Sequence, residues 1–178
     1  MNKKGDLWIS AALYTVLGVI LVTLILSVGL PFVKKIQTRN TLLQTKNIMF
    51  DLDSVIRSVY NEGYGSRRPL FIEINDGNFF IYDKDTLEAE DAKKNRILWT
   101  LISDDNLGIE PDLGFAIKEG NLNIESESLG QGYKIKLYLD YEDINIDSQL
   151  SSELLSGKYN IIVQHVLSDS GSIIEIRE

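Results

Sequence analysis

Residues 7–33 decide the fold, and they read Leu-Trp-Ile-Ser-Ala-Ala-Leu-Tyr-Thr-Val-Leu-Gly-Val-Ile-Leu-Val-Thr-Leu-Ile-Leu-Ser-Val-Gly-Leu-Pro-Phe-Val, without one charged side chain. As an α-helix this stretch would extend about 40 Å, more than the roughly 30 Å hydrocarbon core of a bilayer. A helix pairs every backbone N–H and C=O internally, as lipid requires. A buried core helix is the alternative, but such helices rarely run so long without a charge. The stretch therefore predicts one transmembrane helix.

Charge is distributed unevenly on the two sides of this stretch. Residues 1–35 carry four basic and one acidic side chain, so the totals of 18 and 26 leave 14 basic and 25 acidic side chains in residues 36–178, a net charge of −11. Such a surface repels phosphate groups. We therefore expect no nucleic-acid binding as a main role, and we expect the membrane contact to be made by the apolar helix rather than by the acidic remainder.

The chain has few residues that could support catalysis. It has no cysteine, which excludes disulfides, Cys-ligated zinc and thiol catalysis. His165 is the only histidine; it falls in an expected strand, on the same face as Ile161 and Val163, so a structural role is predicted for it. No phosphate loop, dinucleotide fingerprint, Gly-x-Ser-x-Gly or His-Glu-x-x-His motif occurs. We expect no enzymatic activity, no catalytic residue and no cofactor.

An acidic cluster near residue 140 leaves two interpretations open. Asp140, Glu142, Asp143 and Asp147 are close enough in sequence to suggest a Ca²⁺ loop, but their spacing does not fit an EF-hand. A solvated acidic turn is the simpler interpretation. The sequence alone assigns no metal ligand there.

The residues before the apolar run form a short basic segment. Lys3, Lys4 and Gly5 stand immediately before Asp6 and the hydrophobic stretch, which is far longer than the apolar region of a secretory signal. This arrangement resembles the class III leader of type IV pilins, in the form found in archaeal pilin-like proteins. The resemblance implies that a membrane-bound prepilin peptidase cuts between Gly5 and Asp6 on the cytoplasmic side and leaves the helix on the mature protein. A plain signal anchor with a chance Lys-Lys-Gly is the alternative.

One face of the expected membrane helix suits packing against another helix. Residues three or four apart on this face are Ala11, Thr15, Gly18, Val22, Ile25 and Gly29. Small side chains let helix backbones approach closely in lipid, where hydrophobicity gives no net attraction between helices. The pattern predicts a self-association surface, although glycine and alanine are common in membrane helices of every kind.

The helix is expected to continue beyond the membrane. Ile48, Leu52, Val55 and Val59 recur at helical spacing, and Gly63 is well placed to end the helix. This apolar stripe should lie against the remainder of the chain. Basic residues flank both ends of the apolar run, so charge alone leaves the topology ambiguous. The leader resemblance favours a cytoplasmic N-terminus and an extracytoplasmic C-terminal domain.

The remainder of the chain reads as antiparallel β-structure. Expected strands occupy residues 70–74, 79–82, 96–103, 116–117, 122–125, 133–141, 144–146, 159–167 and 172–177, the first two forming a hairpin over residues 75–78. Residues 85–93 fit a short helix or a strand, and residues 150–155 fit a helical turn. Arg67 and Arg68 could contact an acidic surface of a neighbouring subunit, or more simply a helix C-terminus and a nearby carboxylate.

These assignments predict an α+β chain with five parts. The parts are a leader (1–5), a transmembrane helix (6–33), an extramembrane continuation of the helix (34–62), a linker (63–69) and an antiparallel β domain (70–178). This order is similar to that of type IV pilins and archaellins. The resemblance implies a membrane-anchored surface subunit that associates with itself or with other pilin-like subunits in a filament or pseudopilus. The alternative is a single-pass, signal-anchored binding or structural protein that does not polymerise.

Overall fold

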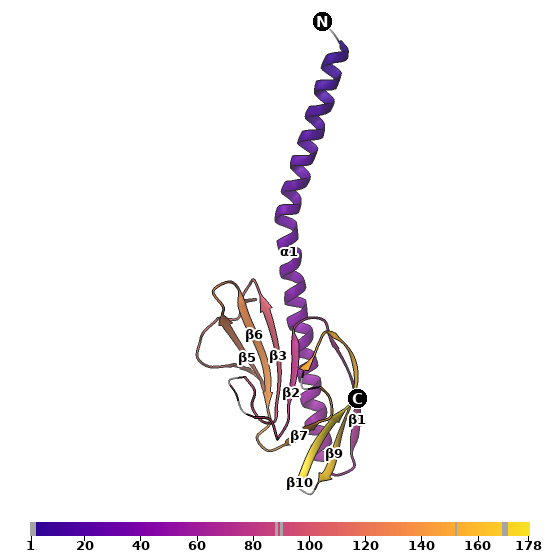
Figure 1. Ribbon diagram of the computed structural model, residues 1–178, viewed down its shortest axis with the longest axis vertical. Coiled ribbons are helices and arrows are strands. Elements are labelled where there is room, and N and C mark those ends of the chain that lie inside the picture. The colour runs from indigo at the N-terminus through magenta and orange to yellow at the C-terminus, as the bar shows by residue number, and fades with distance from the viewer. Residues whose placement is uncertain (1–2, 88, 90, 152, 169–170) are drawn as a thin grey trace. The chain divides into compact units, whose positions relative to one another are not determined.

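The computed structural model describes residues 3–87, 89, 91–151, 153–168 and 171–178. Its first element is helix α1 (Lys3–Glu62), which runs without interruption through Pro31 (Figure 1). Gly63 ends the helix with a φ of 93°, and its N–H donates to the Tyr60 carbonyl at 3.3 Å. Glycine adopts this left-handed conformation at little cost. The single long helix and its predicted end are therefore confirmed.

The chain divides into two compact units, residues 1–39 and residues 40–178. In the second unit, one face of α1 is buried in the core. Met49, Leu52, Ile56 and Val59 are fully buried, and Ile48, Val55 and Tyr60 pack against the same core. The predicted stripe on this helix is confirmed. Burial of one apolar stripe, rather than helix propensity, is what usually stabilises such a helix.

Ten strands in the described part of the chain form two sheets around this core (Figure 1). The strands are β1 (Arg67–Ile74), β2 (Asn78–Tyr82), β3 (Arg96–Ser103), β4 (Ile117–Glu119), β5 (Leu122–Ser128), β6 (Tyr133–Asp140), β7 (Asn145–Ser148), β8 (Glu153–Leu154), β9 (Gly157–Ser168) and β10 (Gly171–Arg177). The four-stranded sheet has the order β1-β9-β10-β7, and the six-stranded sheet has the order β4-β5-β6-β3-β2-β8. Side chains from both sheets and from α1 share one hydrophobic core, so the fold is α+β.

Several strand predictions agree with this topology. β3 lies inside the six-stranded sheet, paired with β2 and β6, and it is buried on both faces over its first four residues. β9 and β10, at the last two expected strands, pair as a terminal hairpin, and β4 and β5 turn at Gly120. Pairing is antiparallel throughout except between β7 and β10, which run parallel.

The predicted hairpin of residues 70–74 and 79–82 is wrong. β1 pairs with β9 in the four-stranded sheet, whereas β2 pairs with β3 and β8 in the six-stranded sheet. The turn itself is present at Gly77, and Trp99 Nε1 donates to the Asp76 carbonyl at 2.9 Å to hold it. Asn-Asp-Gly-Asn specified a chain reversal but not the pairing partner. Pairing with different strands places both β1 and β2 over the common core.

Other local predictions also need correction. Residues 150–155 contain strand β8 rather than a helical turn, because Leu154 is buried as Glu153 and Leu154 pair with β2. The described residues of 85–93 form neither helix nor strand. In β6, Ile135, Leu137 and Leu139 are buried on the core face, and Lys136 and Tyr138 on the opposite face are buried as well. Ion pairs and a guanidinium stacked on Tyr138 cover that second face. The alternation of apolar residues along a strand does not predict burial by such polar contacts.

The Gly77 turn gives a first test of the fold. A Cβ at position 77 would lie 2.5 Å from the Thr100 carbonyl oxygen and 2.7 Å from Trp99 Nε1, at a φ of 82°. We expect Gly77→Ala to lower the free energy of unfolding by about 3 kcal/mol, through left-handed strain and steric overlap together. Gly130→Ala is the matched control, because Gly130 has a φ of 77° with nothing within 4 Å of an added Cβ. It should cost only about 1 kcal/mol. Equal losses in urea denaturation would contradict the described packing at Gly77.

Candidate functional site

The apolar half of α1 is the first candidate surface. Residues 11–33 are exposed apart from Gly29, which is partly exposed, and large apolar side chains such as Trp8, Tyr14 and Val28 are more than 70% exposed. None of the most apolar part of this helix is buried inside the protein. Contiguous exposed apolar surface of this extent indicates a membrane or another protein as its environment. The helix is long and apolar enough to cross a membrane.

The predicted packing residues are open to a partner. Ala11, Thr15, Gly18, Val22 and Ile25 are exposed, and a Cβ at Gly18 or Gly29 would meet nothing within 4 Å. The Thr15 hydroxyl donates to the Ala11 carbonyl at 2.9 Å, so it is satisfied within the helix. Thr23 and Ser27 donate to carbonyls four residues earlier in the same way. These three hydroxyls are thus satisfied by backbone carbonyls of the same helix, an arrangement that suits a lipid environment.

The leader residues lie at the beginning of α1. The helix begins at Lys3, so the Gly5–Asp6 peptide bond belongs to its first turns. The side chains of Lys3, Lys4 and Asp6 lie outside the described part of the chain, which therefore shows no contact for them. Cleavage at Gly5 stays a prediction.

The basic pair near the end of α1 has a local partner. Arg68 Nη2 forms an ion pair with Glu62 Oε1 in the last turn of the helix. The hydrogen bond from Arg68 lowers the pKa of the Glu62 carboxyl, and this effect exceeds that of desolvation. For Arg68 the simpler interpretation, a carboxylate at the helix C-terminus, is confirmed.

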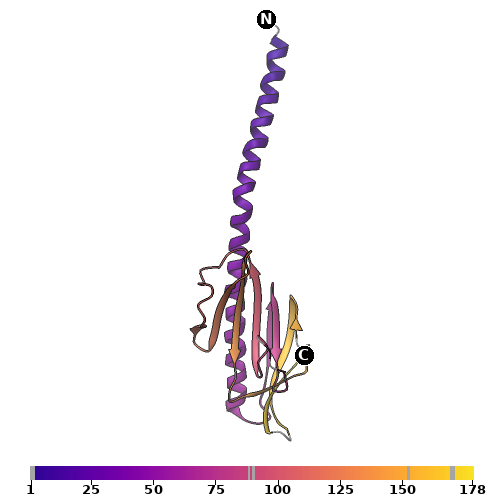
Figure 2. The same cartoon turned by 60° about the vertical axis from the view of Figure 1, so that its left-hand side comes forward.

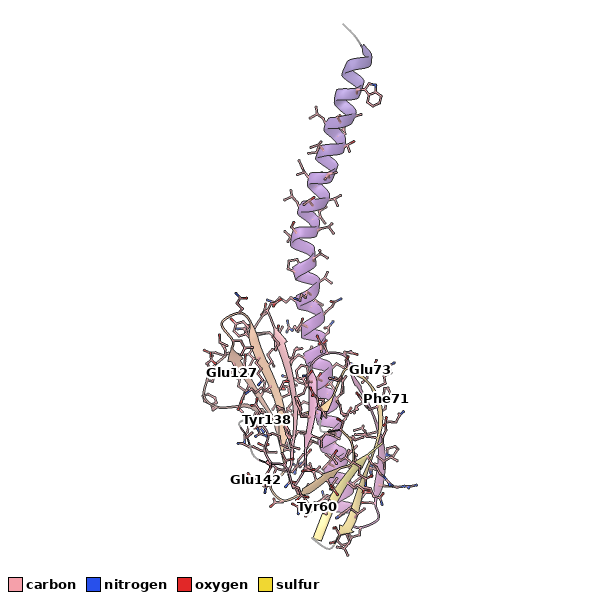
Figure 3. All side chains as sticks on the ribbon, in the orientation of Figure 1. Tyr60, Phe71, Glu73, Glu127, Tyr138 and Glu142 are labelled. Atoms are coloured by element: carbon pink, nitrogen blue, oxygen red, sulfur yellow. The ribbon has the colours of Figure 1, made fainter. Side chains whose placement is uncertain are left out.

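A charged layer that no sequence motif predicts covers the outer face of the six-stranded sheet. Arg96 is 5% exposed and donates twice to Asp140, at 2.6 and 2.9 Å, with its guanidinium 4.2 Å above the centre of the Tyr138 ring. The Tyr138 hydroxyl donates to Glu125 at 2.5 Å. Burial and the Glu125 carboxylate raise the pKa of Tyr138. Figure 3 labels Tyr138 on β6, beside β5. Asp140 is therefore engaged by Arg96 rather than presented as a metal ligand.

Asp91 connects the loop before β3 to the same face. Its carboxylate accepts hydrogen bonds from Lys134 at 2.6 Å and from Lys136 at 2.7 Å. Burial acts to raise the pKa of Asp91, but the two lysines outweigh burial and hold that pKa below its usual value. Lys136 is only 8% exposed and also contacts Glu127 at 3.3 Å. The loop is thus pinned to the sheet by complementary charges.

Acid should weaken this attachment. Because the pKa of Asp91 is lower in the folded chain, its contribution to stability is complete above the unfolded value of about 3.9 and is lost as the pH falls through the folded value. We expect Asp91→Asn to lower the Tm modestly near neutral pH, since the group is partly solvated. The difference in Tm from the unaltered chain should shrink toward about pH 2. A difference that stays constant from neutral to acid in thermal melts would contradict this assignment.

A second polar cluster lies between α1 and the six-stranded sheet. Asp53 is 7% exposed; it accepts two hydrogen bonds from Arg57 at 2.9 and 3.1 Å, and one from Asn121 at 2.7 Å. Asp53 and Arg57 stand four residues apart on α1, a spacing that suits an ion pair, whereas the burial of Asp53 has no signal in the sequence. Burial, together with the Asp53 charge, raises the pKa of the neighbouring Tyr141 well above its usual value. The satisfied carboxylate fixes the β4–β5 turn against the helix, which is a structural role.

His165 occupies the predicted structural position. It is 5% exposed, and its ring stacks on Tyr60 at 5.3 Å and lies against Tyr64 at 4.6 Å. Its Nε2 lies 2.6 Å from the Ser172 hydroxyl, and its Nδ1 has no hydrogen-bond partner among the described residues. A serine–histidine pair resembles half of a catalytic triad. The imidazole here lies against two aromatic rings, and no carboxylate orients it in the described part of the chain.

Metal binding and known relatives give no additional assignment. Within the described residues, no three His, Cys, Asp or Glu side chains are grouped so that they could hold a metal ion. Comparison of the chain with protein-family models, with curated proteins and with solved structures finds no match.

Proposed function

We propose that the chain is a pilin-like subunit, anchored in a membrane by the first half of α1 and assembled through that helix. The observation that carries the proposal is α1 itself: one uninterrupted helix whose residues 11–33 are apolar and exposed, and whose residues 42–59 supply part of the core of a β-rich domain. A secretory signal peptide is cut off and so contributes nothing to the folded domain. Here the apolar segment and the core residues belong to the same helix, which favours an anchor that is retained.

The proposal assigns a role to each part of the chain. The leader, residues 1–5, would be removed by a prepilin peptidase that reads Lys3, Lys4 and Gly5. The mature helix would then cross the membrane with its C-terminal domain on the extracytoplasmic side, and the domain would act as a structural or binding module without enzymatic activity. We expect no nucleic-acid partner, because the acidic residues 36–178 would repel its phosphate groups.

Assembly is tested at Gly18. Gly18→Ile adds a branched side chain where two backbones are proposed to approach, and it leaves the segment at least as hydrophobic. We expect membrane insertion to persist while self-association weakens by about 1 kcal/mol or more per contact. Leu21→Ile, off the proposed face, is the matched control and should leave association unchanged. The measurement is cross-linking of the full chain in membranes.

The alternative anchored monomer predicts a different result. If the unaltered chain and the Gly18→Ile chain are both monomeric at matched membrane density, helix-driven assembly is wrong. The chain would then be a single-pass surface protein that does not polymerise.

A further inference from the structure

Strand β1 is an open edge of the four-stranded sheet. It stands at one end of the order β1-β9-β10-β7 and pairs with β9 along its whole length. Just before β1, the His165 N–H donates to the Ser66 carbonyl and the His165 carbonyl accepts from the Gly65 N–H, both at 2.9 Å. Backbone groups of an antiparallel strand point alternately to its two sides. In this ladder, residues 68, 70, 72 and 74 therefore bond β9, and residues 67, 69, 71 and 73 direct their backbone groups away from it.

The outward backbone groups of β1 have no hydrogen-bond partner in the described part of the chain. They are the N–H groups of residues 67, 71 and 73 and the carbonyls of residues 67, 69, 71 and 73. Pro69 has no N–H to offer, and a proline is tolerated at an edge for that reason. A row of unpaired backbone groups is a template for another strand.

A second copy of β1 complements this edge. When two copies pair antiparallel about a two-fold axis at Leu70, Arg67 of each copy lies opposite Glu73 of the other. Pro69 then lies opposite Phe71, which is 54% exposed. Each of these pairs joins two residues whose backbone groups point outward, so only the missing N–H of Pro69 leaves a bond unmade. Opposite charges and apolar side chains placed directly across two strands stabilise the pairing.

The charges at this edge favour that register. Arg67 is exposed and has no ion pair in the described part of the chain, and Glu73 contacts only the exposed Lys158, at 3.4 Å. Figure 3 labels Phe71 and Glu73 on β1. Shifting the register by two residues in either direction removes both Arg67–Glu73 pairs. Along β1 and β9 the charged side chains are Arg67, Arg68 and Lys158 against Glu73, so the edge lacks the acidic excess of the remaining surface.

From these features we propose that β1 pairs with β1 of a second copy of the chain and joins the two four-stranded sheets. Residues 40–62 of α1 lie along the strands of their own domain (Figure 2), so antiparallel pairing turns these helix segments of the two copies in opposite directions. The pair therefore does not join neighbours in one membrane. With the proposed anchor, on which this placement rests, it joins chains on facing membranes.

A contact of one strand pair is small, and small interfaces are typically weak and transient. Many copies on each of two facing surfaces would add their contacts and so strengthen the attachment.

Charge reversal tests the register in the full chain in nonionic detergent, with sedimentation velocity as the readout. Arg67→Glu and Glu73→Arg each turn both charge pairs of the dimer into like-charge pairs, so each should weaken association about tenfold. An equimolar mixture of the two variants restores both opposite-charge pairs in the mixed dimer. The mixture should associate nearly as strongly as the unaltered chain. Association through α1 is common to all of these chains, so it cannot produce this difference.

Lys94→Glu is the matched control, because it reverses one exposed charge in the loop before β3, outside β1. It should leave association unchanged. Equal weakening by Lys94→Glu would mean that general charge repulsion is measured and would overturn the proposal. An unaltered chain that sediments like its variants, or a mixture that associates no more than its components, would also overturn it.

Vesicles that carry the full chain locate the contact. Vesicles with the unaltered chain should aggregate, as followed by dynamic light scattering, and Arg67→Glu vesicles should aggregate only when they are mixed with Glu73→Arg vesicles. Pairing in detergent without vesicle aggregation would overturn the placement between facing membranes. Cross-linking of the Gly18→Ile chain reports contacts within one membrane, so helix-driven assembly and β1 pairing can fail separately.

Discussion

A chain that begins at Gly63, and so lacks α1, is expected to be unfolded under conditions in which a chain that begins at Ile36 is folded. Met49, Leu52, Ile56 and Val59 are fully buried in the core that both sheets share. Burying each side chain contributes about 1.5–3 kcal/mol, so the four together contribute roughly 6–12 kcal/mol. That range matches the whole stability of an ordinary domain, about 5–15 kcal/mol.

Circular dichroism and urea denaturation of the two chains provide the comparison. The chain from Ile36 should show β-structure and a cooperative transition, and the chain from Gly63 should show neither. Equal melting temperatures would mean that residues 40–62 are not part of the domain.

A matched pair of point variants refines this test. Leu52→Ala should cost about 2–5 kcal/mol, because it leaves a cavity in the core. Leu43→Ala, on the same helix but 50% exposed, should cost under about 1 kcal/mol.

The elements that could be predicted from the sequence are those with a local, periodic signal. Helix α1 carries an uncharged run followed by a stripe of fixed period, and Gly63 supplies its stop. β3, β6 and the β9–β10 hairpin likewise combine apolar patterning with clear turn residues. Such elements can be predicted because the period of their apolar residues indicates both the type of element and the face that is buried.

The failures come from interactions between distant parts of the chain. The turn at Gly77 looks like a hairpin turn. However, β1 pairs with β9 and β2 pairs with β3, and residues 70–82 carry no information about these distant strands. The charged layer was missed because Asp91 meets Lys134 and Lys136 only across more than forty residues of sequence. Alternation along β6 does not show that Lys136 and Tyr138 are buried on its second face, because the charged partners that cover them come from other elements.

Processing is the second result with a large expected effect. In a cell with a prepilin peptidase, the unaltered chain should lose residues 1–5, and Gly5→Leu should abolish the cut entirely. The reason proposed is that the peptidase requires a residue without a side chain directly before the scissile bond, beside the basic pair. Leu7→Ile is the control, because it alters the hydrophobic stretch beyond the cut and should leave processing intact. Mass spectrometry of the membrane fraction distinguishes the cut and uncut chains.

The central claim is that α1 belongs to a pilin-like subunit and not to an ordinary signal anchor. The most direct measurement is N-terminal sequencing of the unaltered protein taken from its own membranes. A first residue of Asp6, with the apolar helix retained, is the result that the proposal predicts. A first residue of Met1, or a cut that removes residues 7–33, would contradict it.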